Sequence, residues 1–216
     1  MKIFITILIL VLIGLGAWFF LGDTPAPEAV VPTGEEVTIA NDGSYEISTA
    51  SSTMSWRGSR PLIPGYFDNG EISIQSGTLM VEDGMIVSGN FVVDMTSIQA
   101  LSTGRGEGED RLSTHLKSAD FFDAANFPTA TFVITSTTPT GEITGNLTIK
   151  GITEPVTLQA NISESGDTLR AEATVELDRT IWNVRYGSGS FFDDFGDNVI
   201  DDNFTVTLNL VAERAD

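Results

Sequence analysis

Apolar and polar residues alternate along most of the chain after Tyr45, which is the pattern of strands that bury one face of a sheet. The runs are short, and Gly, Asn, Asp and Ser separate them, which favours antiparallel strands. The pattern predicts an all-β antiparallel domain, and about eight such strands would form either a sandwich or a barrel. The apolar residues expected to face the interior are Ile72, Ile74, Phe91, Val93, Met95, Leu147, Ile149, Val156, Leu158, Ala160, Ile162, Ala171, Ala173, Val175, Leu177, Phe204, Val206, Leu208 and Leu210.

Two segments carry the signature of hairpin connections. Glu82-Asp83-Gly84 places glycine, which accepts positive φ, between two alternating runs. The segment 150–155, K-G-I-T-E-P, does the same, and Pro155 is expected to preset its turn. Both segments predict that the strands on either side are antiparallel neighbours.

The segment 113–132 departs from the alternating pattern, because it joins the only histidine of the chain to a group of phenylalanines. Ser118 is expected to cap a short helical turn over residues 120–122. Pro128 ends that turn, since the residue before a proline is restricted to extended geometry. Alternation resumes over residues 129–135, so the segment predicts a short helical lid, rich in Phe, that leads directly into a strand.

The N-terminus carries a nearly unbroken apolar run over residues 3–21. As a helix, this run is long enough to cross about 30 Å of hydrocarbon. It exceeds the core of about 7–15 residues found in cleaved signals, and it ends in aromatic residues that favour the membrane interface. We therefore predict an uncleaved transmembrane signal anchor over residues 1–22, with cleavage near Ala26 as the alternative.

Charge gives this anchor an orientation. Lys2 precedes the apolar run and acidic residues follow it, so the positive-inside rule places the N-terminus in the cytoplasm. Residues 23–43, rich in Pro and acids, are expected to form an extended linker, and residues 44–214 the folded domain. The expected location is the cytoplasmic membrane, as a single-pass protein whose domain lies on the extracytoplasmic side, periplasmic or at the cell surface.

Composition narrows the function classes. Eleven Lys and Arg are scattered among 30 Asp and Glu, giving a formal net charge of −19, which disfavours nucleic-acid binding. The chain has no cysteine, so disulfides and thiolate chemistry are excluded. With His115 as the only histidine and no nucleophile-elbow motif, we expect neither catalytic residues nor a metal site. One late acidic cluster lacks the spacing of a calcium loop and is interpreted as a solvated loop: Asp193, Asp194, Asp197, Asp201 and Asp202.

Several motifs in this chain resemble the YceI-like domain, a lipocalin-like β-barrel family associated with polyisoprenoid lipids. The family pattern H-L-x-S-x-D-F-F-D, followed by Y/F-P-x-x-x-F, is matched over residues 115–132. The pattern G-x-L-T-I-x-G-V-T is similar to residues 145–153, and a later family segment resembles residues 178–187. The resemblance spans roughly Tyr45 to Ala212. One departure from the family pattern is the loop-rich stretch 59–69, with Pro61 and Pro64, which is expected beside the barrel mouth.

The resemblance implies a barrel of about eight strands with a short helical lid. It also implies a non-enzymatic binding protein that sequesters or carries a polyisoprenoid-type lipid, either a polyprenyl phosphate or an isoprenoid quinone. No cofactor is expected apart from that lipid as ligand. The residues expected to contact it are Phe67, Phe91, His115, Leu116, Phe121, Phe122, Phe132, Arg179, Trp182 and Arg185.

Three of these residues are expected near the lipid head group: His115, Arg179 and Arg185. For His115 the alternative is a structural role, with its ring bonded to a backbone carbonyl at the lid. Two other functions stay open, namely an enzyme or redox partner acting on a quinone-like ligand, and a protein-interaction module with a solid core. The expected partners are an isoprenoid-type lipid and, through the N-terminal helix, a membrane, with no nucleic acid; a homodimer is left open.

Overall fold

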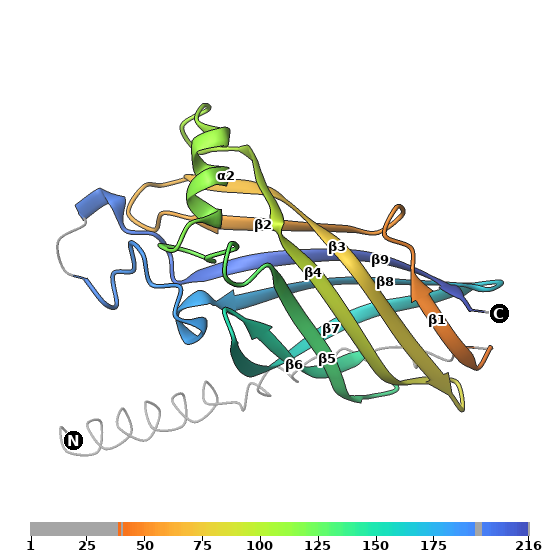
Figure 1. Cartoon of the computed structure of the whole chain (residues 1–216). Helices are drawn as coiled ribbons and strands as arrows, with labels where there is room; N and C mark the ends of the chain where they lie inside the picture. Colours follow the sequence, from red (N-terminus) through yellow and green to blue (C-terminus); the bar gives the residue numbers. More distant parts are fainter. Residues whose placement is uncertain (1–38, 40, 193–195, 216) are drawn as a thin grey trace, which may run out of the picture. The chain divides into compact units, whose positions relative to one another are not determined.

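Nine antiparallel strands form one sheet in the computed structural model, which describes residue 39 and residues 41–192 and 196–215 (Figure 1). One α-helix, α2 (Glu109–Lys117), lies between β4 and β5, and two short 3-10 turns, η1 (Arg179–Trp182) and η2 (Gly196–Asn198), lie between β8 and β9. The strands are β1 (Gly43–Ile47), β2 (Thr53–Ser59), β3 (Phe67–Glu82), β4 (Met85–Ser102), β5 (Thr129–Thr137), β6 (Glu142–Ile149), β7 (Ile152–Ser165), β8 (Thr168–Asp178) and β9 (Asn203–Arg214).

The sheet closes on itself because β3 pairs with β4 as well as with β2. β1 and β2 share one position between β3 and β9: Tyr45 pairs with Leu79 and Arg214, whereas Trp56 pairs with Gly70 and Val206. The nine strands therefore occupy eight positions around a barrel. This confirms the predicted all-β antiparallel barrel of about eight strands.

Both predicted hairpins form, and both turns have two central residues. Asp83 and Gly84 have φ of 51° and 75°, and Lys150 and Gly151 have φ of 49° and 74°. Positive φ at both central positions is the type I′ geometry that matches the twist of paired strands. The role expected for Pro155 was wrong, because it lies within β7 opposite Asn146 and not in the turn.

The helix begins and ends earlier than predicted. α2 has Glu109 and Asp110 in its first turn and Lys117 in its last, charges that complement the helix dipole. Ser118 is not an N-cap: it follows the helix, and its Oγ donates a hydrogen bond to the His115 carbonyl at 2.7 Å. Phe121 and Phe122 lie in turns after Ser118, and the predicted strand then follows as β5.

The inner face of the barrel follows the predicted alternation closely. Every apolar residue assigned to the interior, except Ile162, lines the cavity described below. Ile162 also packs inside, against a core cluster at one end of the barrel. The two-residue period of the sequence therefore identified the interior side of six strands.

The barrel has two distinct ends (Figure 1). At one end, here called the α2 end, lie α2 and the segment between β8 and β9. At the other, the hairpin end, lie the β3–β4 and β7–β8 turns and the C-terminus. Next to those two turns the interior is filled by a group of side chains that are at most 2% exposed, here called the plug: Tyr45, Val81, Leu169 and Ala212.

The last residues of the predicted linker pack at the hairpin end, next to the plug. Ile39 is buried, and its N–H donates to the Gly84 carbonyl at 3.0 Å. Asn41 donates through its side-chain amide to Glu164, and the Tyr45 hydroxyl donates to the Asn41 carbonyl at 2.7 Å. These contacts tie the chain that precedes β1 to the barrel.

The predicted anchor, residues 1–22, lies outside the described residues, as does most of the predicted linker. No helix in the described ranges combines the length and the apolar character needed to cross a membrane.

Candidate functional site

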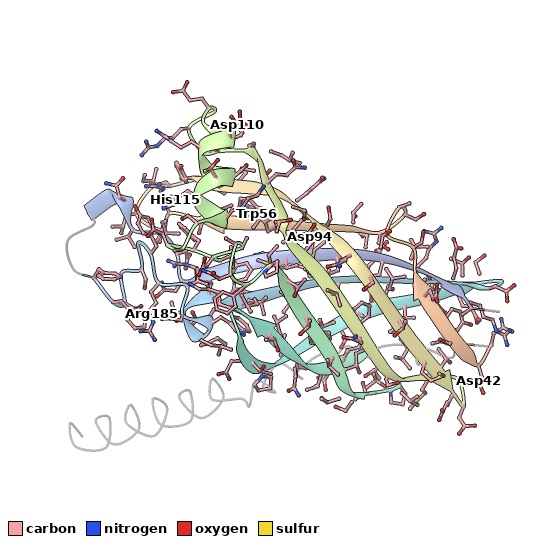
Figure 2. All side chains as sticks on the ribbon, in the orientation of Figure 1. Asp42, Trp56, Asp94, Asp110, His115 and Arg185 are labelled. Carbon is pink, nitrogen blue, oxygen red and sulfur yellow. The ribbon has the colours of Figure 1, made fainter. Side chains whose placement is uncertain are left out.

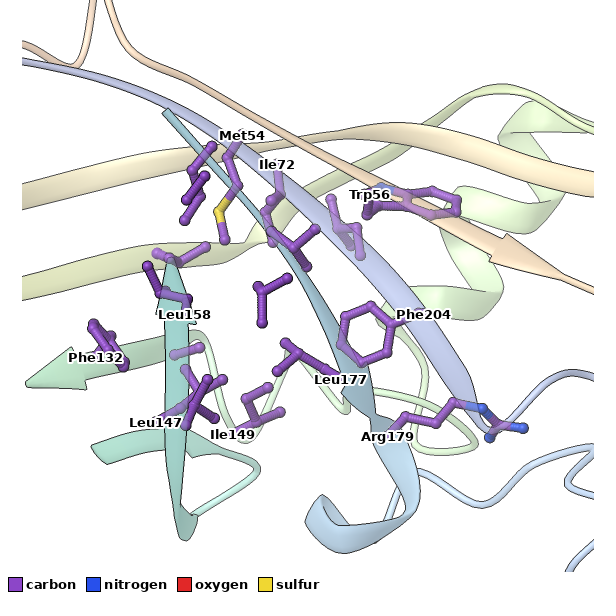
Figure 3. Close-up of a pocket in the computed structure, with 18 of the residues that line it drawn as sticks. Met54, Trp56, Ile72, Phe132, Leu147, Ile149, Leu158, Leu177, Arg179 and Phe204 are labelled. Carbon is purple, nitrogen blue, oxygen red and sulfur yellow. The ribbon is translucent and has the colours of Figure 1, made fainter. Parts of the chain in front are cut away.

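A cavity of about 240 Å³ lies inside the barrel (Figure 3). Its volume exceeds the roughly 150 Å³ of an engineered apolar cavity that binds benzene. Every strand from β2 to β9 contributes to the wall, through inward-facing residues such as Met54, Ile74, Val93, Ala130, Leu147, Leu158, Ala173 and Leu208. The cavity is therefore the interior of the barrel itself, between the plug and the α2 end.

Polar side chains line only the α2 end of this cavity. They come from the end of β2 and the residue after it, from the start of β3, and from the segments that flank β8 and β9. The rest of the wall is apolar, so the cavity combines a hydrocarbon-like shaft with one polar end. The polar lining residues, here called the polar end, are Ser59, Arg60, Asp68, Arg179, Asp201 and Asn203.

The α2 segment covers the same end of the cavity. Leu112 and Leu116 of the helix line it, together with Phe121 and Phe122 of the turns that follow. Ser113 holds the helix to the barrel, because its Oγ accepts a hydrogen bond from the Ala100 N–H at 2.8 Å. This agrees with the predicted lid rich in Phe, although the helix itself contributes leucines.

The structure brings six of the ten predicted ligand contacts to the cavity wall and leaves four elsewhere. Their role in binding remains a prediction for all ten. The six at the wall are Phe91, Leu116, Phe121, Phe122, Phe132 and Arg179. The four that do not line it are Phe67, His115, Trp182 and Arg185.

His115 lies on α2, at the α2 end of the barrel, but outside the cavity lining (Figure 2). Its Nε2 shares a hydrogen bond of 3.1 Å with the Asp120 carboxylate, not with the backbone carbonyl considered for a structural role. The ring packs edge-on against Phe121 and Tyr186, with centroids 4.9 and 4.6 Å away. These contacts fix the turn after α2, which in turn places Phe121 at the cavity wall.

Arg179 lines the cavity, but its nitrogens are used by the protein. Nε donates to the Asp201 carbonyl at 2.9 Å, Nη1 to Val184 at 2.6 Å and Nη2 to Ile200 at 3.1 Å. Burial lowers the pKa of this guanidinium, and the nearby Asp202 carboxylate partly offsets that effect. Arg179 therefore stabilises the chain between β8 and β9, and in Figure 3 its nitrogens lie at the far end of the side chain from the apolar residues.

Two more of the predicted contacts, Phe67 and Arg185, have other partners. Phe67 is five residues before the inward Ile72 on β3, and it lies under the Arg57 guanidinium at 4.0 Å. Arg185 is exposed and stacks on the Phe191 ring at 4.3 Å.

Trp182 seals the wall of the barrel instead of lining the cavity. β7 pairs with β8 only from Ala160 onward, so its first half is paired on one side. Trp182 is 1% exposed, belongs to the same buried cluster as Val156 and Leu177, and donates from Nε1 to the Leu147 carbonyl at 3.1 Å. The indole thus fills the gap where the two strands separate.

Sequence reasoning missed a part of the site on β2. Met54, Trp56 and Gly58 alternate toward the cavity, and Arg60 follows just beyond the strand. Among the described residues, Trp56 Nε1 and Arg60 Nε are the two buried side-chain nitrogens that lack a hydrogen-bond partner. The signal in the sequence was weak, because Ser, Gly and Arg interrupt a short apolar run.

The described residues contain no group of three or more His, Cys, Asp and Glu side chains placed to hold a metal ion. Asp193 and Asp194 of the predicted acidic loop lie outside the described residues. Asp201 and Asp202 accept hydrogen bonds from Ser59 and Ser190.

A family model described as the YceI-like domain matches residues 45–212. Protein YceI of Escherichia coli O6:H1 is 41% identical over 81 residues, covering 36% of this chain and 39% of that protein. Protein YceI of Salmonella arizonae is 52% identical over 56 residues, covering 24% of this chain and 29% of that protein. The chain thus spans at most about two fifths of the length of these curated relatives in the alignments.

Two solved structures share the fold. BcnA of Burkholderia cenocepacia has a TM-score of 0.59 at 24% identity, covering 76% of this chain and 98% of that chain. A polyisoprenoid binding domain of Saccharophagus degradans, implicated in plant cell wall breakdown, has a TM-score of 0.61 at 14% identity, covering 79% of this chain and 98% of that chain. At these identities the likeness concerns the barrel architecture.

Proposed function

The chain belongs to the YceI-like domain family, and we propose that it is a non-enzymatic binding protein that holds an isoprenoid-type lipid inside its barrel. The observation that carries this proposal is the cavity, which is apolar along its shaft and polar at one end. An amphiphile with a long apolar tail and a small polar head has the same distribution of polarity. The tail would occupy the shaft, and the head would lie at the polar end beneath α2.

The cost of an empty cavity supports an occupant. Side chains that face an apolar cavity lose the dispersion contacts that a packed core would give them. Apolar voids do not recover this cost by filling with water, because water finds no hydrogen-bond partners there. An apolar tail recovers it by restoring contacts with the wall.

The comparisons support the chemical class of the occupant. One protein with the same barrel is described as a polyisoprenoid binding domain, and isoprenoid tails are flexible enough to follow a shaft lined by branched side chains. The cavity argues against the solid-core interaction module, which needs a filled barrel. For this chain the ligand is proposed to be a polyprenyl phosphate or an isoprenoid quinone.

The location is also a proposal. We place the barrel on the extracytoplasmic side of the cytoplasmic membrane, held by the apolar N-terminal segment, residues 1–22. There it would shelter the lipid from water next to the bilayer.

A cavity-filling variant tests the function on the full chain. Ala173 faces the cavity from β8, whereas its neighbour Thr174 is exposed on the outer face of the same strand. We expect native mass spectrometry of the wild-type protein, released from detergent, to show a retained lipid whose extracted mass is that of an isoprenoid. Ala173→Phe places a ring in the shaft. It is expected to lower the fraction of protein that retains lipid at least about tenfold, because it removes the space for the tail. Thr174→Phe is the matched control and should stay loaded.

Two results would contradict the proposal. The first is a wild-type protein that carries no lipid and takes up no added isoprenoid. The second is equal loading of Ala173→Phe and Thr174→Phe.

A further inference from the structure

The α2 end of the barrel carries most of the large apolar side chains that are exposed to solvent. Of the ten such residues in the described ranges, Met80, Val87 and Val133 lie singly on the outer faces of β3, β4 and β5. The other seven lie at the α2 end, in the connections between strands or at strand ends. Single apolar residues are normal on a protein surface, whereas a concentration of them marks an interaction surface. Five of the seven are here called the apolar rim: Leu62, Phe67, Leu101, Ile181 and Phe191.

The rim belongs mainly to two connections that lie next to each other, the β2–β3 connection and the segment between β8 and β9. The Arg60 side chain donates to the Asn198 side chain at 3.1 Å, and the Asp201 N–H donates to the Ser59 carbonyl at 3.0 Å. Both connections extend beyond the strands at this end (Figure 1). Apolar side chains on projecting connections can enter a deformable surface such as a bilayer, whereas a protein partner needs a surface of matching shape.

Arginine stacks on aromatic rings at the same end. Such a pair places an apolar ring directly beside a cation. At the boundary between acyl chains and head groups, the ring is buried while the guanidinium reaches the phosphate oxygens, so these pairs suit a bilayer surface. The three stacks found among the described residues, with the distance from the guanidinium carbon to the ring centroid, are Arg57 on Phe67 (4.0 Å), Arg60 on Tyr66 (5.1 Å) and Arg185 on Phe191 (4.3 Å).

Charge differs between the two ends of the barrel. Of the ten Lys and Arg in the described ranges, only Arg170 and Arg214 lie near the hairpin end. The turns at that end carry acids, among them Glu82, Asp83 and Asp167. At the α2 end the other eight basic residues are mixed with acids. A bilayer that contains anionic lipids therefore repels the hairpin end more strongly and favours approach by the α2 end.

The chain that precedes the barrel is long enough for this orientation. It joins the barrel at the hairpin end, where the Ile39 N–H donates to the Gly84 carbonyl. Residues 23–38, 16 in all, connect Ile39 to the proposed anchor and reach at most about 55 Å. β9 runs from one end of the barrel to the other in 12 residues, which rise about 40 Å. The α2 end can therefore contact the bilayer that holds the anchor.

We infer that the α2 end is a docking surface for a lipid bilayer. The apolar rim enters the head-group region, and the exposed guanidinium groups of Arg57 and Arg185 lie next to lipid phosphates. The polar end of the cavity then faces the bilayer, and the hairpin end faces away from it. This inference goes beyond the proposed function, and its test does not depend on a lipid in the cavity.

Site-specific fluorescent labels test the orientation on the full chain. Because the chain has no cysteine, a single introduced cysteine carries a single label. Leu62→Cys labels the rim, and Val87→Cys labels an exposed apolar position near the hairpin end as the matched control. Each protein is reconstituted into vesicles of phosphatidylcholine and phosphatidylglycerol, in which some lipids carry a nitroxide on the upper acyl chain. Interfacial side chains lie about 5–10 Å into the head-group boundary, so we expect the nitroxide to quench the Leu62 label at least about threefold more than the Val87 label.

Charged substitutions then test the rim itself. Ile181→Asp combined with Phe191→Asp should at least about halve the quenching of the Leu62 label, because it removes apolar surface that enters the bilayer. Met80→Asp combined with Val133→Asp, on the outer wall of the barrel, should leave that quenching unchanged.

Three results would overturn the inference. The first is equal quenching of the two labels in the wild-type background, or stronger quenching of the Val87 label, a comparison that does not depend on the folding of the charged variants. The second is unchanged quenching in the Ile181→Asp, Phe191→Asp protein. The third is a Leu62 label that the lipid nitroxide does not quench but that is shielded from a water-soluble quencher, which would assign the rim to a protein partner or a second copy of the chain.

Discussion

The two ends of the barrel share most of their strands and the same alternation, yet side chains fill the hairpin end and leave a cavity between it and the α2 end. On β3 the cavity-lining Leu79 is followed two residues later by Val81 of the plug. On β8 the plug residue Leu169 is followed two residues later by the cavity-lining Ala171. On both strands, the packed core and the cavity wall are therefore formed by successive inward-facing residues.

Side-chain size explains much of the difference. At the hairpin end β1 adds Tyr45, which is fully buried across the interior. Along the cavity several inward positions hold alanine, namely Ala130, Ala160, Ala171 and Ala173. Alternation thus decides which residues face inward, whereas their summed volume decides whether the interior is filled. An inward apolar residue is not by itself evidence of a packed core.

Of the substitutions proposed below, removal of the Arg179 guanidinium should destabilise the protein most, through the α2 end. Arg179 donates to three carbonyls of the segment between β8 and β9, whose Val184 also packs in the apolar cluster with Leu116. We expect Arg179→Met to lower the free energy of unfolding by about 4 kcal/mol, because it leaves those carbonyls without their donor and removes the cation paired with Asp202. Urea unfolding of the full chain measures this.

Arg185→Met is the matched control, since Arg185 is exposed and only stacks on Phe191. Arg185→Met should lower the free energy of unfolding by less than about 1 kcal/mol. Equal losses in the two variants would mean that Arg179 does not hold this end of the barrel.

Two leucine truncations compare the plug with the cavity directly. Leu169 is 2% exposed within the plug, whereas Leu158 borders the cavity. We expect Leu169→Ala to lower the free energy of unfolding by about 3 kcal/mol, because it creates a void in packed surroundings. Leu158→Ala should lower it by about 1.5 kcal/mol, because one side of Leu158 already lacks contacts. Thermal unfolding without added lipid separates the two. A larger loss for Leu158→Ala would show that the plug is the looser region.

The Tyr45 hydroxyl gives the plug a dependence on alkaline pH. Burial raises the pKa of this phenol, and the charge of Glu164 adds to the rise. Its contribution to stability is therefore complete below the ordinary tyrosine pKa of about 10 and is lost as pH rises toward the higher value in the folded protein. We expect urea unfolding to show this decline as the pH rises above about 10.

Tyr45→Phe should lower stability by about 1 kcal/mol at neutral pH, through loss of the bond to the Asn41 carbonyl, and should reduce the alkaline decline. Tyr186→Phe, at the opposite end of the barrel, should keep the decline. If both variants behave alike, burial of Tyr45 is not the cause.

The sequence predicts the strands and their inward faces well, because a period of two follows from strand geometry alone. It does not predict the cavity, because that depends on the distances between residues on opposite walls. Arg179 illustrates the same limit: its type suggests a phosphate contact, but carbonyls of Val184, Ile200 and Asp201 reach it only in the folded chain. His115 lies on α2 as part of the covering segment, yet its ring is turned toward Asp120 and does not line the cavity.

Photo-crosslinking with a four-isoprene benzoquinone that carries a diazirine at the end of its tail tests most directly whether the barrel interior holds the lipid. The full chain is irradiated with this ligand bound, and the labelled peptides are identified by mass spectrometry. A tail in the shaft predicts labels near the plug, on residues such as Leu79, Ile143 and Ala160, and their loss in Ala173→Phe. Labels confined to exposed residues such as Phe191 and Phe192, unchanged in Ala173→Phe, would contradict the claim that the barrel interior holds the lipid.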